Sequence, residues 1–121
     1  MATLTESVHT GEFLVSEANN TLSREQVELA PSLMLYSGTV LGKNTATGIY
    51  SPVDPAADDG SQMAAGVLYN NTQTDATGGE AVLIARLAEV DASLLIWPDG
   101  ITDEQKATAI TELGALDIAL R

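Results

Sequence analysis

The side chains best suited to acid–base or nucleophilic chemistry are sparse in this chain. His9 is the sole histidine and stands in a polar stretch at the start of the sequence, and cysteine is absent. Nucleophilic catalysis needs an imidazole held rigidly beside a hydroxyl or thiol, and a zinc site needs further histidine or thiolate ligands. We therefore expect His9 to be exposed to solvent, and we expect no catalytic, cofactor-binding or metal-binding residues.

A short acidic stretch raises the possibility of a calcium site. Asp54, Asp58 and Asp59 lie within the sequence DPAADDG. The calcium loop of an EF-hand needs acids at alternate positions, a glycine at the sixth and a bidentate glutamate at its end. The spacing here breaks that pattern, whereas proline, aspartate and glycine are typical of tight bends. The sequence therefore favours an acidic, solvated turn.

Three further features have both a functional and a structural interpretation. Gly78-Gly79 lacks the strand–helix setting and the lysine of a phosphate-binding loop, so it predicts a hairpin turn. Trp97, beside Pro98, either lines a ligand pocket or anchors a helix to a sheet, and we favour the anchor. Arg86, within an apolar stretch, either points to solvent or pairs with an acid such as Glu89 or one from a neighbouring subunit. The sequence leaves the role of Arg86 open.

Charge excludes several classes of partner. The 121 residues include 17 acids and 5 bases, for a net charge of −12, and the bases are scattered. Such a chain repels nucleic-acid phosphates and anionic membranes. No basic segment followed by an apolar run marks a signal peptide, so we expect synthesis in a cytoplasm. Aromatic residues make up only 4%, so the core must consist of small aliphatic side chains, which favours burial between identical subunits.

Most of the chain has the pattern of β-strands. Short apolar or β-branched runs bounded by turn residues predict a single mainly β domain with one or two short helices. The expected strands cover residues 33–36, 39–43, 47–53, 64–69 and 80–90, and residues 70–79 are expected to form a polar loop.

One helix is expected near the C-terminus. Thr102 and Gln105 have the spacing of a capping box, with acids in the first turn and apolar residues at helical spacing after them. Gly114 predicts a left-handed stop, and alternation over residues 116–120 predicts a final strand.

The first thirty residues differ from the rest. We expect residues 1–30 to form a flexible N-terminal arm and residues 31–121 to form the β-rich domain. The apolar run Phe13-Leu14-Val15 needs a partner surface, on this domain or on another protein. Residues 23–26 match a capping box, but the alternation of Val27-Glu28-Leu29 favours an extended segment.

Several of these stretches, in this order, resemble the lambda-type head decoration proteins of tailed phages. The resemblance extends from residue 11 to residue 121. It rests on GEFLVSEAN (11–19), SRE (23–25), GTVLG (38–42), AGVLY (65–69), AVLIARLAEV (81–90), WPDG (97–100), the helix from Thr102, and the final Leu120-Arg121.

The resemblance implies a β-clip-like fold and a structural role without catalysis. Members assemble as homotrimers on the outside of the expanded phage head, at three-fold and quasi-three-fold positions, and clamp neighbouring subunits of the major capsid protein. Their N-terminal arm is mobile in the free protein and orders on the capsid, where it adds a strand to the capsid protein. Carried over here, this role falls to Gly11, Glu12, Phe13, Leu14 and Val15. Main-chain hydrogen bonds would give affinity, while Phe13 and Leu14 fill pockets.

Two rival classes remain from the sequence. One is another virion structural module, such as a tail or fibre component. The other is a small enzyme, because β-clip folds also host small-molecule chemistry and a fold alone does not decide function.

Overall fold

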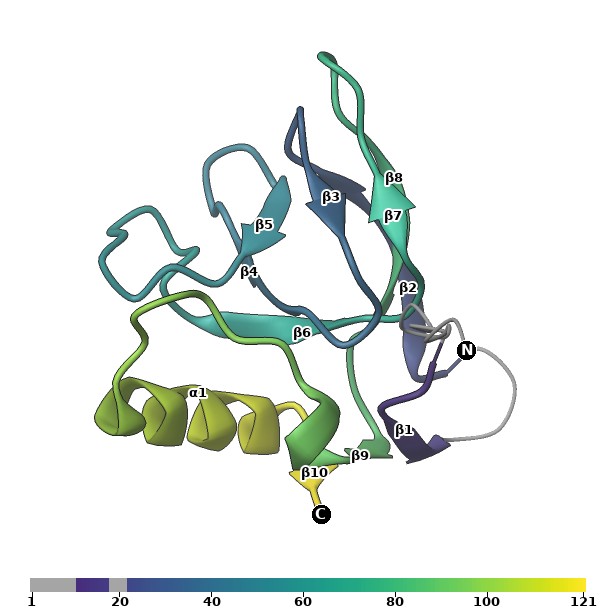
Figure 1. Ribbon diagram of the computed structural model, residues 1–121, viewed down its shortest axis with the longest axis vertical. Helices are drawn as coiled ribbons and strands as arrows, with labels where there is room; N and C mark the ends of the chain where they lie inside the picture. Colours follow the sequence, from purple (N-terminus) through teal and green to yellow (C-terminus); the bar gives the residue numbers. More distant parts are fainter. Residues whose placement is uncertain (1–10, 18–21) are drawn as a thin grey trace, which may run out of the picture.

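The computed structural model describes residues 11–17 and 22–121, and in them the chain is mainly β with one α-helix and one short 3₁₀ helix (Figure 1). The mainly β prediction, with one or two short helices, is therefore confirmed. The elements are β1 (Leu14–Glu17), β2 (Arg24–Leu29), β3 (Met34–Leu35), β4 (Val40–Lys43), β5 (Tyr50–Pro52), β6 (Ala64–Leu68), β7 (Thr72–Gln73), β8 (Gly79–Ile84), β9 (Ala88–Val90), η1 (Ala92–Leu94), α1 (Asp103–Ala115) and β10 (Ile118–Leu120).

Five strands close into a barrel in the order β2-β5-β4-β6-β8. The longest ladder joins β2 to β8 antiparallel, from Arg24 opposite Ile84 to Leu29 opposite Gly79. In β2 the side chains of Val27 and Leu29 are buried while Glu28 is exposed, as the alternation in the sequence predicts. Residues 24–29 are therefore part of the barrel, and the domain begins before the expected boundary at residue 30.

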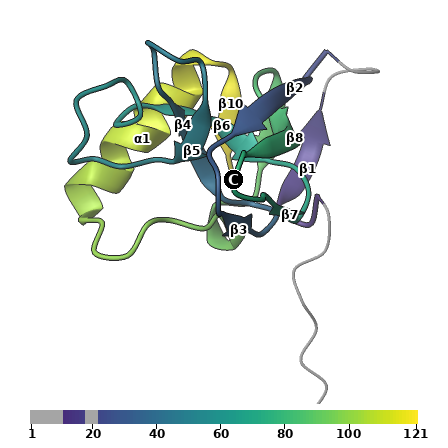
Figure 2. The same ribbon diagram turned by 90° about the horizontal axis from the view of Figure 1, so that it is seen from above.

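A second, smaller sheet lies beside the barrel and contains both ends of the described chain. Its order is β1-β9-β10, with β1 antiparallel and β10 parallel to the central β9. The α1 helix contacts β6 of the barrel and β10 of this sheet. In both views α1 and β1 lie on opposite sides of the molecule (Figures 1 and 2).

The core consists mainly of small aliphatic side chains, as the composition predicts. One cluster includes Phe13, Ile84, Leu113 and Ile118, so it joins the N-terminal segment, the barrel, α1 and β10. The other is drawn from the barrel strands and includes Leu29, Leu41, Leu68 and Leu83.

The predicted helix is present, but its end differs from the prediction. The Thr102 side chain accepts a hydrogen bond from the Gln105 backbone, and the Gln105 side chain accepts one from the Thr102 backbone, so the capping box is confirmed. Gly114 lies within the helix, and Asp117 (φ 61°) is the left-handed residue. Aspartate tolerates this conformation because of its short polar side chain, so the helix continues past the glycine.

The predicted strand over residues 80–90 is two strands in different sheets. Leu87 between them has a left-handed backbone (φ 53°). Its carbonyl accepts a hydrogen bond of 2.8 Å from the buried Ser23 hydroxyl, and its N–H donates to the Leu116 carbonyl at 3.3 Å. These contacts hold the bend at which the chain passes from the barrel to the small sheet.

Two other boundaries also differ from the sequence prediction. The strand expected over 47–53 is restricted to β5, and the loop expected over 70–79 contains β7, which pairs with β3. The predicted hairpin turn is confirmed, since Gly78 (φ 100°) closes it opposite Asp75 just before β8.

Candidate functional site

The residues expected to bind a partner, Gly11 to Val15, form a turn that leads into β1. Gly11 (φ 70°) donates its N–H to the Tyr69 carbonyl at 2.9 Å and to the Ser37 hydroxyl at 3.0 Å. A Cβ atom at this glycine would lie 3.0 Å from the Tyr69 ring. The positive φ and the close ring both favour glycine, so this position fixes where the N-terminal segment meets the barrel.

Phe13 is buried in the core of this domain, with 1% of its surface exposed. Its carbonyl accepts a hydrogen bond of 2.6 Å from the Asp91 N–H, just beyond β9. Leu14 is half-buried against the same cluster. The sequence left open whether this apolar run packs against its own domain or against another protein. In the structure, Phe13 packs against its own domain.

The other face of the segment is open to solvent. Glu12 and Ser16 are exposed, and Val15 has 54% of its surface exposed. Within residues 11–17 and 22–121, β1 is hydrogen-bonded to β9 along one edge, and no strand pairs with the other edge. An unpaired edge presents N–H and C=O groups that another strand can use.

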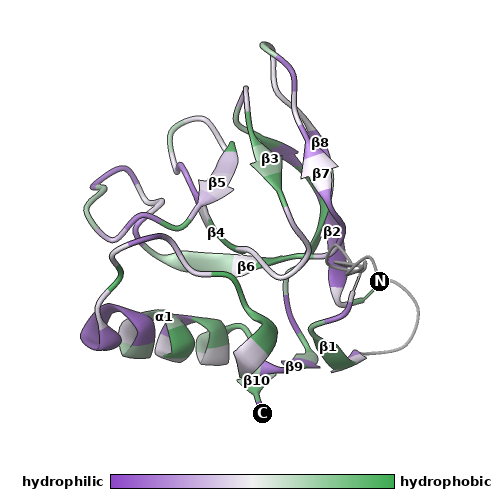
Figure 3. Ribbon diagram, viewed as in Figure 1, coloured by the Kyte–Doolittle hydropathy of each residue, from purple (hydrophilic) through white to green (hydrophobic). Residues whose placement is uncertain are grey.

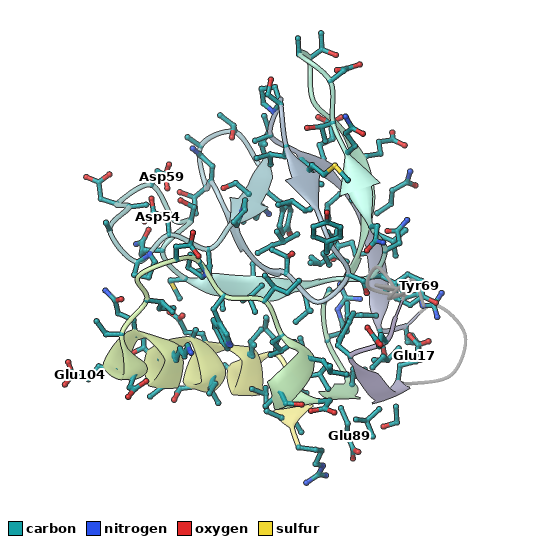
Figure 4. All side chains as sticks on the ribbon, in the orientation of Figure 1. Glu17, Asp54, Asp59, Tyr69, Glu89 and Glu104 are labelled. Carbon is teal, nitrogen blue, oxygen red and sulfur yellow. The ribbon has the colours of Figure 1, made fainter. Side chains whose placement is uncertain are left out.

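A cluster that the sequence did not predict holds the end of β1. Arg24 forms two hydrogen bonds with the Glu17 carboxylate, at 2.6 and 3.0 Å, and its guanidinium lies 4.0 Å from the centre of the Tyr69 ring. The hydrogen bond to Glu17 is the main reason that the pKa of Arg24 is raised above its ordinary value. Figure 4 shows Glu17 and Tyr69 on the same side of the molecule. No spacing in the sequence signals this arrangement, because Tyr69 is remote in the chain.

The acidic stretch over residues 54–60 forms a turn. The Asp54 carboxylate accepts the Ala56 N–H, and the Asp59 carboxylate accepts both the N–H and the hydroxyl of Ser61. These bonds from Ser61 hold the pKa of Asp59 below its ordinary value. In the part of the chain that the structure describes, no group of three or more acidic, histidine or cysteine side chains could hold a metal ion.

Arg86 is exposed and has an acidic partner. It pairs with Glu25 at 2.6 Å and donates to the Leu22 carbonyl at 2.8 Å. The suggested partner Glu89 is instead paired with Arg121, which holds the pKa of Glu89 below its ordinary value. Strand β9 turns away from the barrel after Leu87, and this separates Glu89 from Arg86.

Trp97 is half-buried against the core cluster that includes Ala109 and Leu113 of α1, in agreement with the anchoring role. It also lines a groove of about 250 Å³ together with Met34, Tyr36 and Pro98. His9 lies outside the described residues.

The sequence matches the model of one protein family. The model described as "Bacteriophage lambda head decoration protein D" matches residues 3–118, nearly the whole chain. No curated protein matches the sequence. Among the described residues, no helix has the length and apolar character needed to cross a membrane.

Proposed function

The chain belongs to the bacteriophage lambda head decoration protein D family, a family of structural proteins of the phage capsid, and from this we propose how it acts. As a homotrimer, it binds the outer surface of the expanded head at three-fold and quasi-three-fold positions. There it clamps neighbouring subunits of the major capsid protein and stabilises the shell against the pressure of packaged DNA. Its function is binding, and it carries out no catalysis.

The observation that carries this proposal is the unpaired edge of β1. An extended segment of the capsid protein can pair with this edge, so that main-chain hydrogen bonds supply affinity. The edge belongs to a strand that is already paired with β9 and is tied to β2 by the ion pair between Glu17 and Arg24. Because β1 is ordered before binding, less conformational entropy is lost when the capsid strand is added.

The five expected contact residues fall into two groups, which face the domain or face solvent. Gly11 and Phe13 face the domain and fix the segment, whereas Glu12 and Val15 face outward and are free to contact the capsid. Leu14 lies between the two groups. In this proposal the residues before Gly11 extend the contact across the capsid surface.

The charge of the chain suits this location. With a net charge of −12, a protein on the outer surface is repelled by DNA and attracted to basic side chains of the capsid. The repeated sites of an icosahedral shell then add avidity to each trimer contact.

The direct test is to mix the purified protein with expanded, undecorated heads and to image the three-fold positions by electron microscopy. We expect density at these sites for the full chain. The proposal is wrong if the protein leaves the heads bare and instead labels tails or fibres of intact particles.

Two variants test the contribution of the N-terminal segment. The substitution Val15→Glu is expected to lower the affinity for heads at least about ten-fold, because it removes an apolar side chain from the outward face. Deletion of residues 1–10 tests the proposed contact of the N-terminal arm in the same assay. Met63→Glu is the matched control, since Met63 is 53% exposed but lies beside the barrel. Equal loss of binding in the control would show that β1 has no special role.

A further inference from the structure

A patch of exposed and half-buried apolar side chains surrounds β3, and we call it the β3 patch. Met34 has 60% and Tyr36 42% of its surface exposed. Both line the groove of about 250 Å³ that also contains Trp97. Figure 3 shows β3 as a hydrophobic strand beside the more polar β7. The patch consists of Met34, Tyr36, Pro52, Ile96, Trp97 and Pro98.

The side-chain alternation along β3 is unusual for a strand that faces water. Leu35 packs against the barrel core, so the neighbouring Met34 and Tyr36 point the other way. Outward positions of an antiparallel strand usually carry polar residues. The two outward apolar side chains therefore indicate that the patch is covered in the assembled protein.

The charge of the patch indicates what covers it. Asp99 is the one charged residue that lines this groove, whereas the lining of a larger groove includes five charged residues: Glu25, Lys43, Arg86, Glu112 and Asp117. Two copies of a chain with a net charge of −12 repel each other wherever acids meet. An apolar patch almost without charge avoids this repulsion, so it fits an identical copy of the chain.

Rotational symmetry strengthens this argument. Close to a three-fold axis each side chain faces the same side chain of the other two copies, so a charged residue would meet two like charges. Tyrosine, methionine and tryptophan are enriched at the centres of protein interfaces, and charged residues are depleted there.

We propose that the β3 patch lies at the three-fold axis of the trimer, where it is the contact between copies of this chain. The inference rests on the proposed function, since it assigns a surface to the trimer that binds the head. Met34 and Tyr36 supply the buried centre of the contact, and Trp97 forms the wall against which a neighbouring copy packs.

The first test measures oligomeric mass in solution, without capsids, by light scattering or sedimentation. Met34→Glu is expected to raise the concentration at which trimers dissociate at least about ten-fold, because it places a charge in the centre of the contact. Leu22→Glu is the matched control, since Leu22 is also 60% exposed and lies outside the patch. Far-UV circular dichroism of each variant checks that the fold is retained. A folded Met34→Glu protein with the trimer stability of the wild type would overturn the inference.

The second test uses the absence of cysteine in the natural chain. Met34→Cys is expected to give disulfide-linked dimers under mild oxidation, and Leu22→Cys is expected to give none beyond the background. Equal cross-linking of the two variants would also overturn the inference. If Met34→Cys cross-links but the wild-type protein does not bind expanded heads, the β3 patch stands and the proposed function fails. If trimers bind heads but Met34 neither cross-links nor affects assembly, the function stands and the patch does not.

Discussion

Replacing Phe13 with alanine tests whether the N-terminal segment, residues 11–17, is part of the core or serves only to bind the capsid. Phe13 is 1% exposed and packs in the cluster shared by the barrel, α1 and β10. Removing a buried phenylalanine side chain costs about 3–5 kcal/mol. For a chain of this length, 1 kcal/mol corresponds to roughly 4 °C in melting temperature. We therefore expect Phe13→Ala to lower the melting temperature by about 10 °C or more.

The assay is thermal unfolding followed by circular dichroism, with Val15→Ala as the control. Val15 lies in the same segment but is 54% exposed, so its truncation should change stability by less than about 0.5 kcal/mol. The stability lost in Phe13→Ala has an upper limit. Residues 11–17 can detach from the barrel, and detachment costs less free energy than a large cavity in the core. Equal melting temperatures for the two variants would show that the segment contributes nothing to the fold and would refute its place in the core.

Three other perturbations have expected outcomes. Thr102→Ala removes the helix cap and should lower the free energy of unfolding by about 1 kcal/mol, measured by urea denaturation. Gly42→Ala should lower it by about 1–3 kcal/mol, because the added methyl group would overlap a backbone carbonyl group, and an unchanged urea midpoint would contradict this packing. The pKa values of Asp59, Asp75 and Asp91 are held below the ordinary 3.8, each mainly by a hydroxyl two residues further on. Because the folded pKa is the lower one, the stabilisation from these three carboxylates is present above the unfolded value of 3.8 and is lost as the pH falls through the folded pKa. Replacing Asp59, Asp75 and Asp91 with asparagine should therefore flatten the decline of the urea midpoint below pH 3.8, and an unchanged decline would contradict this assignment.

Local signals in the sequence were enough to predict many elements. The Thr102–Gln105 capping box, the alternation of Val27 and Leu29 in β2 and the hairpin glycine at 78 each depend on contacts within a few residues. Such preferences depend only on residues that are close in the sequence, so the fold class and the α-helix could be predicted from them.

The features that the sequence did not reveal depend on long-range contacts. The bend at Leu87 is held by Ser23 and Leu116, which are remote in sequence, and the strand pattern continues through it without interruption. Phe13 has the same apolar character whether it enters this core or a capsid pocket, and only its position next to β9 decides between them. The resemblance to a family predicted that Gly11 to Val15 contact the capsid. Which of these side chains face the domain and which face solvent is visible only in the structure.

The position of β9 between β1 and β10 determines where a foreign peptide attached to this protein would lie. Both the N-terminal segment and Arg121 flank this one strand, whereas the tip of the hairpin before β8 lies at the opposite end of the long axis (Figure 1). A peptide fused after Arg121 would therefore emerge beside the surface proposed to contact the capsid. Exposed loop tips tolerate insertions well, so a peptide inserted between Ala76 and Thr77 would be carried away from the shell, where an antibody or a receptor could reach it.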